Sequence, residues 1–386
     1  AYYRAKEGEY VLVKLEARFE ERPLPRVSII DMREQLKKGN RLALSLELRE
    51  DLSQCLKKGE QAMLFLNRRG YAGFVSCRSC GHVMKCPHCD VSLSEHNGRK
   101  LICHYCGYET VKPDKCPVCS SPYIGGFKAG TQQIQQVVEK EFPEARVLRM
   151  DYDTTRAKGS YEKILSAFSR HEADILIGTQ MIVKGHDFPN VTLVGVLAAD
   201  LSLYVSDYHA AERTFQLLTQ AAGRAGRGSE PGEVVIQTYQ PDHYSVQAAK
   251  EQDYEAFYEQ EMEYRRMLLY PPVWNMLVIL CASKQEQTAY DSAKLLVQEI
   301  DTWQENIKAA MERVGEDFKK KRVFPVGPAD PAVAKVNDIY KKVIYIKTKD
   351  YQTLVELKDR LEHYMRDNKA FKDMVVQFDF NPMSGF

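Results

Sequence analysis

Eight of the ten cysteines of this 386-residue chain fall into four Cys-x-x-Cys pairs within residues 77–119. Four such pairs supply eight thiolates, the number that two closed tetrahedral zinc sites require. Disulfides or buried free thiols are the alternative, but paired cysteines in a long chain without a secretory segment favour metal and a reducing compartment. The block therefore predicts two structural zinc sites with no open position for a catalytic water.

The segment between the second and third cysteine pairs indicates how the pairs share the metals. An Asn97-Gly98 dipeptide separates two strand-like segments there, which is a strong signal for a β-hairpin. A hairpin brings its flanking knuckles to the same end, so we expect a nested arrangement in which the inner pairs bind one zinc and the outer pairs the other. The predicted ligands are Cys77, Cys80, Cys116 and Cys119 for site 1 and Cys86, Cys89, Cys103 and Cys106 for site 2.

Three histidines and two further cysteines offer other possible ligands. His82, His88 and His104 lie among the cysteine pairs, but eight thiolates already fill two sites, which favours surface or supporting roles for these histidines. Cys55 and Cys281 lie in apolar segments, so we expect both to be packed thiols.

Outside the cysteine block, strand-like and helix-like segments alternate along the chain. Residues 61–66, 174–178, 191–197 and 233–239 are mostly continuous apolar runs, as in parallel strands that are covered on both faces. Residues 206–226 form a long helical candidate between two of these runs. The alternation predicts an α/β fold, a doubly wound parallel sheet with helices on both faces and a zinc-binding insertion.

The pattern changes after about residue 242. A connecting helix is expected over residues 244–268, and the remainder alternates as in a small α+β domain. The predicted organisation is residues 1–45 as a linker or the end of a preceding lobe, 46–76 with 120–242 as the α/β domain, 77–119 as the zinc insertion, and 243–386 as the C-terminal α+β domain with its connecting helix.

Charge and hydropathy place limits on the function. The chain has 54 Lys and Arg against 53 Asp and Glu, so its bulk charge gives no indication of nucleic-acid binding. No apolar run approaches the roughly 20 residues that a membrane-spanning helix needs, and no secretory segment opens the chain. We therefore expect a cytoplasmic protein without a membrane partner.

Residues 214–228, TFQLLTQAAGRAGRG, combine two arginines with two flanking glycines. On a continuous helix Gln220, Arg224 and Arg227 lie at i, i+4 and i+7, along one stripe. Two arginines on one face can clamp a γ-phosphate and stabilise the charge of a transition state. A solvated basic face is the alternative.

A second motif favours the phosphate-binding interpretation. Residues 178–189, GTQMIVKGHDFP, directly follow the apolar run at 174–178. Ligands of open α/β sheets gather at the carboxyl ends of strands, so the glycines and hydroxyls of this segment suit phosphate contacts. Asp187 is placed to hold a ribose or to orient an arginine. An ordinary loop is the alternative, but the two motifs together favour nucleotide handling.

The two motifs carry a family resemblance. DILIGTQMIVKGHDFPNV and LLTQAAGRAGRG resemble motifs V and VI of superfamily-two helicases. LFLNRRGYAGFVSC before the four knuckles and KAGTQQIQQVVEKEFPEARVLRMDYDTT after them closely resemble the bacterial primosomal protein N-prime family of replication-restart helicases. The match is strong over residues 44–239 and weaker beyond. It departs at Tyr208-His209, where the family pattern has Phe-Arg, and no role is assigned there.

The resemblance implies a RecA-like helicase lobe two of a 3′-to-5′ DNA translocase that recognises stalled forks and D-loops and helps to reload the replicative helicase. It implies ATP and Mg²⁺ as cofactors of the intact protein. It also implies DNA, the tail of the single-stranded DNA-binding protein and primosome or helicase-loader proteins as partners, and a cytoplasmic, nucleoid-associated location in a bacterium.

The resemblance also implies residue roles. Arg224 and Arg227 correspond to arginine fingers, Gln220 to the residue that couples ATP to motion, and Gly185 and Asp187 to the nucleotide cleft. The residues expected to contact DNA are Thr179, Gln180, Lys184, Asn67 and Arg68, and Asn67, Arg68 and Arg69 are expected on a surface that faces DNA or the companion lobe.

Two motifs that phosphoryl transfer needs do not occur in the sequence. It contains no G-x-x-x-x-G-K-[ST] phosphate loop and no Asp-Glu pair to hold Mg²⁺. In the family both belong to helicase lobe one. Because the chain starts at Ala1 and not at Met, we expect that it begins just after that lobe, carries half of an ATPase site and is inactive as an ATPase by itself.

Two other function classes remain open. One is a non-enzymatic zinc-ribbon adaptor that binds nucleic acid and partner proteins, and the other is a ribosome- or RNA-associated zinc-ribbon protein. Neither needs the GTQMIVKGHDFP and QAAGRAGR motifs, which is the feature that favours the helicase.

Overall fold

The structure is a computed structural model. It describes residues 1–14, 23–66, 75–88, 91–96, 100–104, 106–125, 130–182, 187–203, 207–228 and 232–383. The chain divides into two compact units, and each is described by itself. Unit 1 comprises Ala1–Val83, Pro113–Val205 and Ala210–Tyr258, and unit 2 comprises Met84–Lys112, Ser206–His209 and Glu259–Phe386. The cysteine block is thus shared between the two units.

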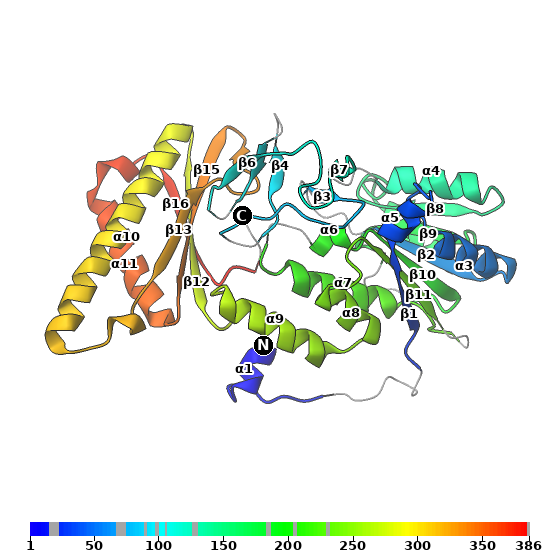
Figure 1. The fold of residues 1–386 in the computed structure, drawn as a ribbon, viewed down its shortest axis with the longest axis horizontal. Helices are drawn as coiled ribbons and strands as arrows, with labels where there is room; N and C mark the ends of the chain where they lie inside the picture. The colour runs from blue at the N-terminus through cyan, green and yellow to red at the C-terminus, as the bar shows by residue number, and fades with distance from the viewer. Residues whose placement is uncertain are drawn as a thin grey trace. The chain divides into compact units, whose positions relative to one another are not determined.

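Unit 1 is built on a six-stranded parallel sheet (Figure 1). In spatial order its strands are β1 (Arg26–Asp31), β11 (Glu233–Thr238), β10 (Val191–Leu197), β2 (Gln61–Leu66), β9 (Ile175–Gly178) and β8 (Val147–Met150). Every neighbouring pair in this order is parallel. The predicted α/β fold with a parallel sheet is therefore confirmed.

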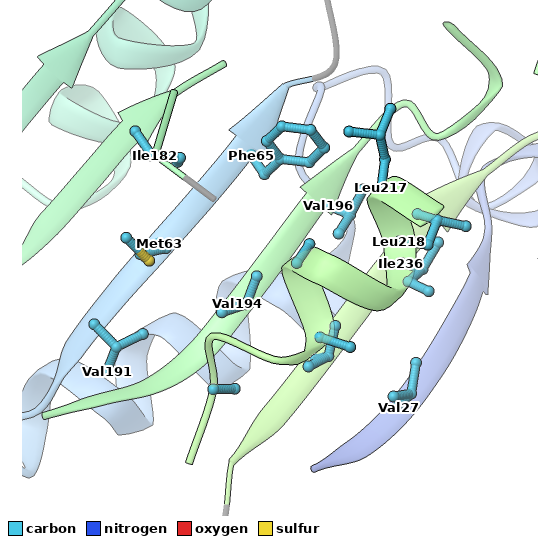
Figure 2. Packing of buried hydrophobic residues seen from close by; sticks show 14 of the residues in the cluster. Val27, Met63, Phe65, Ile182, Val191, Val194, Val196, Leu217, Leu218 and Ile236 are labelled. Carbon is cyan, nitrogen blue, oxygen red and sulfur yellow. The ribbon is translucent and has the colours of Figure 1, made fainter. Parts of the chain in front are cut away.

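Helices cover both faces of this sheet, because alternate residues of each strand point to opposite sides. Met63 and Phe65 of β2 belong to one apolar cluster, whereas Leu64 and Leu66 belong to the other. The first cluster is completed by α5 (Ser160–Ser169), α7 (Ala210–Ala222) and α8 (Tyr244–Glu251), and the second by α3 (Leu46–Lys57), α4 (Thr131–Glu141) and α6 (Asp200–Leu203). Figure 2 shows the first cluster, with the strand residues on the side that α7 covers.

The N-terminal segment differs from the prediction. The interpretation of residues 1–45 as a linker or the end of a preceding lobe is wrong for residues 26–37, because β1 pairs with β11 of this sheet along its whole length and α2 (Met32–Lys37) follows directly. Val27 is the only buried residue of β1, as expected for an edge strand. The apolar signal of this strand is therefore too weak to be recognised in the sequence. The domain limits as a whole stay a prediction.

Gly195 lies at a point of close contact between β10 and its neighbours. A Cβ atom there would lie 2.7 Å from Leu64 Cδ2 and 3.1 Å from the methyl groups of Leu48, and both leucines are fully buried. Gly195→Ala should therefore lower the free energy of unfolding by about 1–3 kcal/mol, measured by urea titration. Gly223→Ala is the matched control, since its Cβ would meet nothing closer than 3.5 Å. Equal losses in the two variants would contradict this packing argument.

Unit 2 contains an antiparallel sheet packed against two helices. Its strands, in spatial order, are β13 (Phe324–Ala329), β15 (Ile339–Thr348), β12 (Asn275–Ser283) and β16 (Val375–Phe380), and β14 (Lys335–Val336) pairs with β15. The covering helices are α10 (Glu286–Val314) and α11 (Tyr351–Asp367). Leu277 and Ile279 of β12 share an apolar cluster with Leu296 of α10 and Leu357 of α11. The predicted α+β character of this part is confirmed.

The expected connecting helix over residues 244–268 is two helices, α8 and α9 (Tyr254–Met267). Gln252 between them has a left-handed backbone with φ of 55°, which ends α8. The Asp253 side chain then accepts a hydrogen bond from the Ala256 N–H at 2.9 Å and caps α9. None of the helices in the described part of the chain is long and apolar enough to cross a membrane.

The cysteine block forms small sheets in both units. In unit 1, β3 (Ser76–Cys77) pairs with β7 (Ile124–Gly125). In unit 2, β4 (Ser94–His96), β5 (Lys100–Ile102) and β6 (Glu109–Val111) form an antiparallel ribbon. β4 and β5 are the two arms of the predicted hairpin, and the Asn97-Gly98 dipeptide between them lies outside the described residues.

Tyr208, where the sequence departs from the family pattern, is buried within unit 2. Its ring stacks on that of Tyr270 with the centroids 4.8 Å apart, and the Arg265 guanidinium lies 5.5 Å from the ring centroid. Its hydroxyl donates a hydrogen bond to the Pro382 carbonyl at 3.3 Å. These contacts give Tyr208 a packing role.

Candidate metal and nucleotide sites

The four knuckles share one hydrogen-bond pattern. The N–H of the first cysteine donates to the carbonyl five residues later, at 2.7–2.9 Å, in the pairs Cys77–His82, Cys86–Val91, Cys103–Tyr108 and Cys116–Ser121. Two glycines, Gly81 and Gly107, follow second cysteines and have φ of 77° and 76°. Glycine adopts this left-handed conformation without steric cost, which accounts for its place in both knuckles.

The outer knuckles bring four sulfur atoms together in unit 1. The sulfurs of Cys77, Cys80, Cys116 and Cys119 all lie within 4.8 Å of one another. The Cys77–Cys119 and Cys80–Cys116 sulfur pairs are each 3.6 Å apart. A tetrahedral zinc ion with bonds of about 2.3 Å holds its sulfurs about 3.8 Å apart. The cluster therefore has the size and the ligand chemistry of a structural zinc site.

The inner knuckles form a second cluster, in unit 2. The sulfurs of Cys86, Cys103 and Cys106 lie within 4.8 Å of one another, with Cys86 and Cys106 3.5 Å apart. Cys89, the fourth predicted ligand, lies outside the described residues. The described cysteines divide between the two clusters as the nested arrangement requires, and the complete ligand sets stay a prediction.

The histidines do not join these clusters within the described residues. His104 is buried, and its Nδ1 lies 2.9 Å from the Asp330 carbonyl oxygen, so it connects the ribbon to the sheet of unit 2. Cys55 and Cys281 are packed thiols, as predicted. Burial raises the pKa of Cys55 to about 11 and that of Cys281 to about 12, which keeps both protonated at neutral pH.

The arginine segment differs from the predicted helical stripe. α7 ends at Ala222, so Arg224 and Arg227 lie in the loop that follows, whereas Gln220 lies in the last turn of the helix. Gly226 has φ of 68°, and its N–H donates to the Val191 carbonyl at 3.1 Å. The prediction of one continuous stripe is wrong, because the glycine-rich segment ends the helix after Ala222.

This arginine loop packs against the end of the second motif. Arg227 Nη1 lies 3.3 Å from Asp187 Oδ1, and Arg227 Nε donates to the Gly223 carbonyl at 2.8 Å. A Cβ atom at Gly228 would lie 2.5 Å from the Pro189 carbonyl oxygen, so only glycine permits this approach. The structure thus brings together Asp187 and Arg227, two of the residues that the sequence proposed.

Arg224 lies in the same electrostatic environment. Its partial burial and the positive charge of Arg227 lower the pKa of the Arg224 guanidinium, while the Asp187 carboxylate acts in the opposite direction. The loop therefore holds two cations close together beside one exposed carboxylate, an arrangement that an added anion such as a phosphate would stabilise.

The two ends of the second motif lie at opposite ends of the strands, one at the carboxyl-terminal edge of the sheet and the other at the amino-terminal edge. Thr179 follows β9 at the carboxyl edge, and its N–H lies 3.4 Å from the Met150 carbonyl of β8. Gly178 of β9 and Val196 of β10 align with the same residue of β2, so they lie at the same level of the sheet. Val191, whose carbonyl accepts the hydrogen bond from the Gly226 N–H, lies five residues before Val196 in β10, about 17 Å away along the strand. The expectation that the whole motif lies at the carboxyl end is wrong for Asp187, which precedes β10 at the amino edge.

Several predicted site residues lie outside the described part of the chain. They are Gly185 of the expected nucleotide cleft and Lys184, Asn67, Arg68 and Arg69 of the expected DNA-facing surface. Thr179 and Gln180 are described, and both are half-buried.

Asp200, a buried carboxylate of α6, was not anticipated from the sequence. It accepts hydrogen bonds from the Thr238 hydroxyl at 2.8 Å and from the Tyr239 N–H at 2.9 Å. Burial nevertheless raises its pKa to about 6. No local pattern marks this residue, because its partners come from β11 and the residue after it, 38 and 39 positions away.

The raised pKa of Asp200 predicts a pH dependence. The folded state binds this proton more tightly than the unfolded chain, so the contribution of Asp200 to stability rises as the pH falls from 7.5 through about 6. The unfolding free energy of Asp200→Asn minus that of the parent should be larger at pH 7.5 than at pH 5.5, by about 1 kcal/mol. Urea titrations at both pH values measure it.

Asp174→Asn is the control for this titration. The Arg146 side chain lowers the pKa of Asp174 through a bidentate hydrogen bond at 2.6 and 3.1 Å. Asp174 is therefore ionised throughout this pH window, and the effect of its substitution on the unfolding free energy should stay constant. A pH-independent difference for Asp200→Asn would contradict the assignment.

Comparison with known proteins matches both parts of this arrangement. Residues 123–229 match the helicase conserved C-terminal domain, and residues 86–110 match the PriA DNA helicase Cys-rich region domain. The first range contains the arginine loop and both edges of the second motif, and the second contains the inner cysteine cluster. The fold and its sites therefore define a helicase C-terminal lobe with a zinc ribbon.

Relatives identify the family within this class. The chain is 47% identical over 384 residues to the Replication restart protein PriA of Bacillus subtilis, 41% over 377 residues to that of Synechocystis, and 35% over 393 residues to that of Chlamydia pneumoniae. These alignments cover 99%, 96% and 100% of this chain but 46%, 43% and 50% of the relatives. The chain belongs to the PriA family of replication restart proteins and spans about half the length of the curated relatives it matches.

Among solved structures, the second domain of the DEAD-box helicase Mss116p, bound to an RNA duplex, aligns at 12% identity with a TM-score of 0.30. The alignment covers 61% of this chain and 67% of that one.

Proposed function

We propose that this chain is the C-terminal part of an ATP-dependent 3′-to-5′ DNA helicase that acts at stalled replication forks and D-loops and restarts replication by primosome assembly. Membership of the PriA family supports the proposal. The observation that carries it is the arginine loop, in which Arg227 is fixed by Asp187 and Gly223 beside Arg224. An adaptor protein has no need of such a loop.

In this proposal the arginine loop forms one wall of the ATP site. Two hydrogen bonds, from Nε to Gly223 and from Nη1 to Asp187, fix the plane of the Arg227 guanidinium. A guanidinium held in this way stabilises the charge that develops on a transferred phosphoryl group. Arg224 would act beside it, Gln220 would couple ATP to motion, and Gly185 with Asp187 would line the nucleotide. ATP supplies the phosphoryl group, and lobe one would hold the Mg²⁺ ion.

DNA would bind at the other edge of the sheet. The proposed contacts are Thr179, Gln180, Lys184, Asn67, Arg68 and Arg69, which come at or after the carboxyl ends of β9 and β2. Of these residues the structure describes Thr179 and Gln180, which directly follow β9, and the carboxyl end of β9 lies beside that of its neighbour β2. The arginine loop lies at the amino edge, so the two ligands would contact different edges of the same sheet.

The remaining proposals follow from the cysteine clusters and the family. Two structural zinc ions would be bound by Cys77, Cys80, Cys116 and Cys119 and by Cys86, Cys89, Cys103 and Cys106. The partners would be forked and single-stranded DNA, the tail of the single-stranded DNA-binding protein and primosome or helicase-loader proteins. The location would be the cytoplasm of a bacterium, at the nucleoid.

ATP hydrolysis by the 386-residue chain tests the division of the active site. The chain contains neither a phosphate-loop lysine nor an Asp-Glu pair, so it should show no DNA-stimulated hydrolysis above background, whereas the full-length protein should hydrolyse ATP. A colorimetric phosphate assay with and without DNA measures both. Turnover by the chain at a rate comparable to the full-length protein would contradict the proposed half-site, and no turnover by either would favour the zinc-ribbon adaptor.

A further inference from the structure

The loop after β8, residues 151–159, lies at the same edge as the proposed DNA contacts. β8 is one of the two outermost strands of the sheet and pairs in parallel with β9, with Met150 aligned to Gly178. The chain therefore leaves β8 at the level where it leaves β9 toward Thr179. The carboxyl ends of β2, β9 and β8 lie side by side in this order. The DNA contacts proposed above follow β2 and β9 in the sequence, and none of them follows β8.

Tyr152 in this loop is exposed to an unusual degree for an aromatic residue. Its exposed fraction is 73%, so it makes no contribution to the core. The Arg156 guanidinium lies 5.3 Å from the centroid of its ring, as in a cation–π contact. Arg156 and Lys158 are also exposed, so the loop presents an aromatic ring together with two cations.

Hydrogen bonds around Asp151 hold the loop in place. The buried Asp151 carboxylate accepts from the Thr131 hydroxyl of α4 at 2.5 Å and from the Thr154 N–H at 3.0 Å. The Asp151 carbonyl accepts from the Thr155 hydroxyl at 2.7 Å and from the Thr155 N–H at 3.1 Å. Tyr152 follows this anchored residue directly, so binding a ligand to its ring would require little ordering of the backbone.

We propose that Tyr152 stacks on a base of single-stranded DNA and that Arg156 and Lys158 contact the neighbouring phosphates. The inference rests on the proposed DNA-translocating function and extends its contact surface to the end of β8. Exposed aromatic rings beside basic side chains are the usual means of binding single strands without sequence preference. A motor that moves along DNA needs contacts of this sequence-independent kind.

The charges of the loop indicate that stacking contributes more than phosphate attraction. Asp153 is exposed as well, and its negative charge offsets one of the two positive charges of Arg156 and Lys158, so the net exposed charge of the loop is only +1. A purely electrostatic site would carry a larger positive charge. The ring should therefore matter more than either cation, and the site should prefer single strands, whose bases are free to stack, over duplexes.

Binding of a fluorescein-labelled oligo-dT to the 386-residue chain tests the proposal. Tyr152→Ala should weaken binding by about tenfold or more, because base–aromatic stacking is lost. Tyr152→Phe keeps the ring and should bind like the parent. Because Tyr152 is exposed, its removal should leave the melting temperature unchanged. The charge control is Arg170→Ala, an exposed arginine whose ion pair with Glu172 lies at the surface.

Two further readouts separate stacking from charge. Arg156→Ala should reduce the slope of log affinity against log salt by about 0.7, the value for one phosphate contact on a single strand. An oligonucleotide that contains 5-bromodeoxyuridine should photo-crosslink to the peptide that carries Tyr152, and this crosslink should disappear in Tyr152→Ala.

Each outcome bears on a different claim. If the parent chain binds oligo-dT and Tyr152→Ala binds equally well, the stacking role is wrong while the helicase proposal stands. If Tyr152→Ala weakens duplex and single-stranded binding to the same extent, stacking is also wrong. If neither the chain nor the full-length protein binds single-stranded DNA, both the stacking role and the proposed function fail.

Discussion

Arg227→Ala in the full-length protein should lower DNA-stimulated ATP turnover by about 10³- to 10⁵-fold, the range that an arginine finger contributes in related phosphoryl-transfer enzymes. The guanidinium acts on the charge of the transition state, and its plane is set by Gly223 and Asp187. The KM for ATP should change much less, because the phosphate cradle and the Mg²⁺ ligands would lie in lobe one. Steady-state kinetics at saturating DNA measure both constants.

Three other variants identify the cause of this loss. Arg227→Lys keeps the charge but not the planar fork, so it should restore little of the activity. Asp187→Asn keeps the arginine but weakens the contact that orients it, so turnover should fall less than in Arg227→Ala. Arg170→Ala removes an exposed surface arginine and should leave turnover unchanged. If Arg227→Ala retained turnover within tenfold of the parent, the arginine-finger role would be wrong.

The second large effect concerns the zinc ions. The purified chain should hold two zinc ions, and Cys86→Ser should reduce the content to about one, because a thiolate of site 2 is lost. Structural zinc contributes about 10–16 kcal/mol to the folding of small zinc domains at pH 7, so the ribbon should lose its order without it. Elemental analysis measures the metal, and hydrogen exchange measures the order of residues 84–112.

Because the two cysteine clusters belong to different units, the loss of order caused by Cys86→Ser should be confined to part of the chain. Increased exchange should include the ribbon and the Asp330 region that His104 contacts, whereas the parallel sheet of unit 1 should keep its protection. Cys55→Ser is the matched control, since Cys55 is a packed thiol outside both clusters, and it should retain two zinc ions. A parent chain with one metal, or loss of metal in Cys55→Ser, would contradict the two-site arrangement.

Strands buried on both faces were the part of the fold that the sequence predicted best. β2, β9 and β10 have continuous apolar sequences because their residues pack alternately into two clusters. β1 has no such continuous apolar sequence because this edge strand buries little, and its register with β11 is what identifies it as a strand. Local sequence thus predicts the central strands, whereas the edge strand depends on a partner about 200 residues away in the chain.

The candidate sites show the same division between local and distant information. The nested cysteine clusters are predictable because the Asn97-Gly98 dipeptide is a local sequence signal for a hairpin. The predicted helical stripe of Gln220, Arg224 and Arg227 is wrong, because α7 ends at Ala222, directly before the glycine-rich segment. Contacts such as Arg227 with Asp187, 40 residues apart, arise only when the sheet places the two segments together.

Strand unwinding by the full-length protein tests the central claim most directly. The substrates are two short duplexes that differ only in whether the single-stranded tail has a 3′ or a 5′ end. We predict ATP-dependent unwinding of the 3′-tailed duplex, little unwinding of the 5′-tailed one, and loss of activity in Arg227→Ala but not in Arg170→Ala. Failure to unwind either substrate, or unwinding that Arg227→Ala leaves intact, would contradict the account.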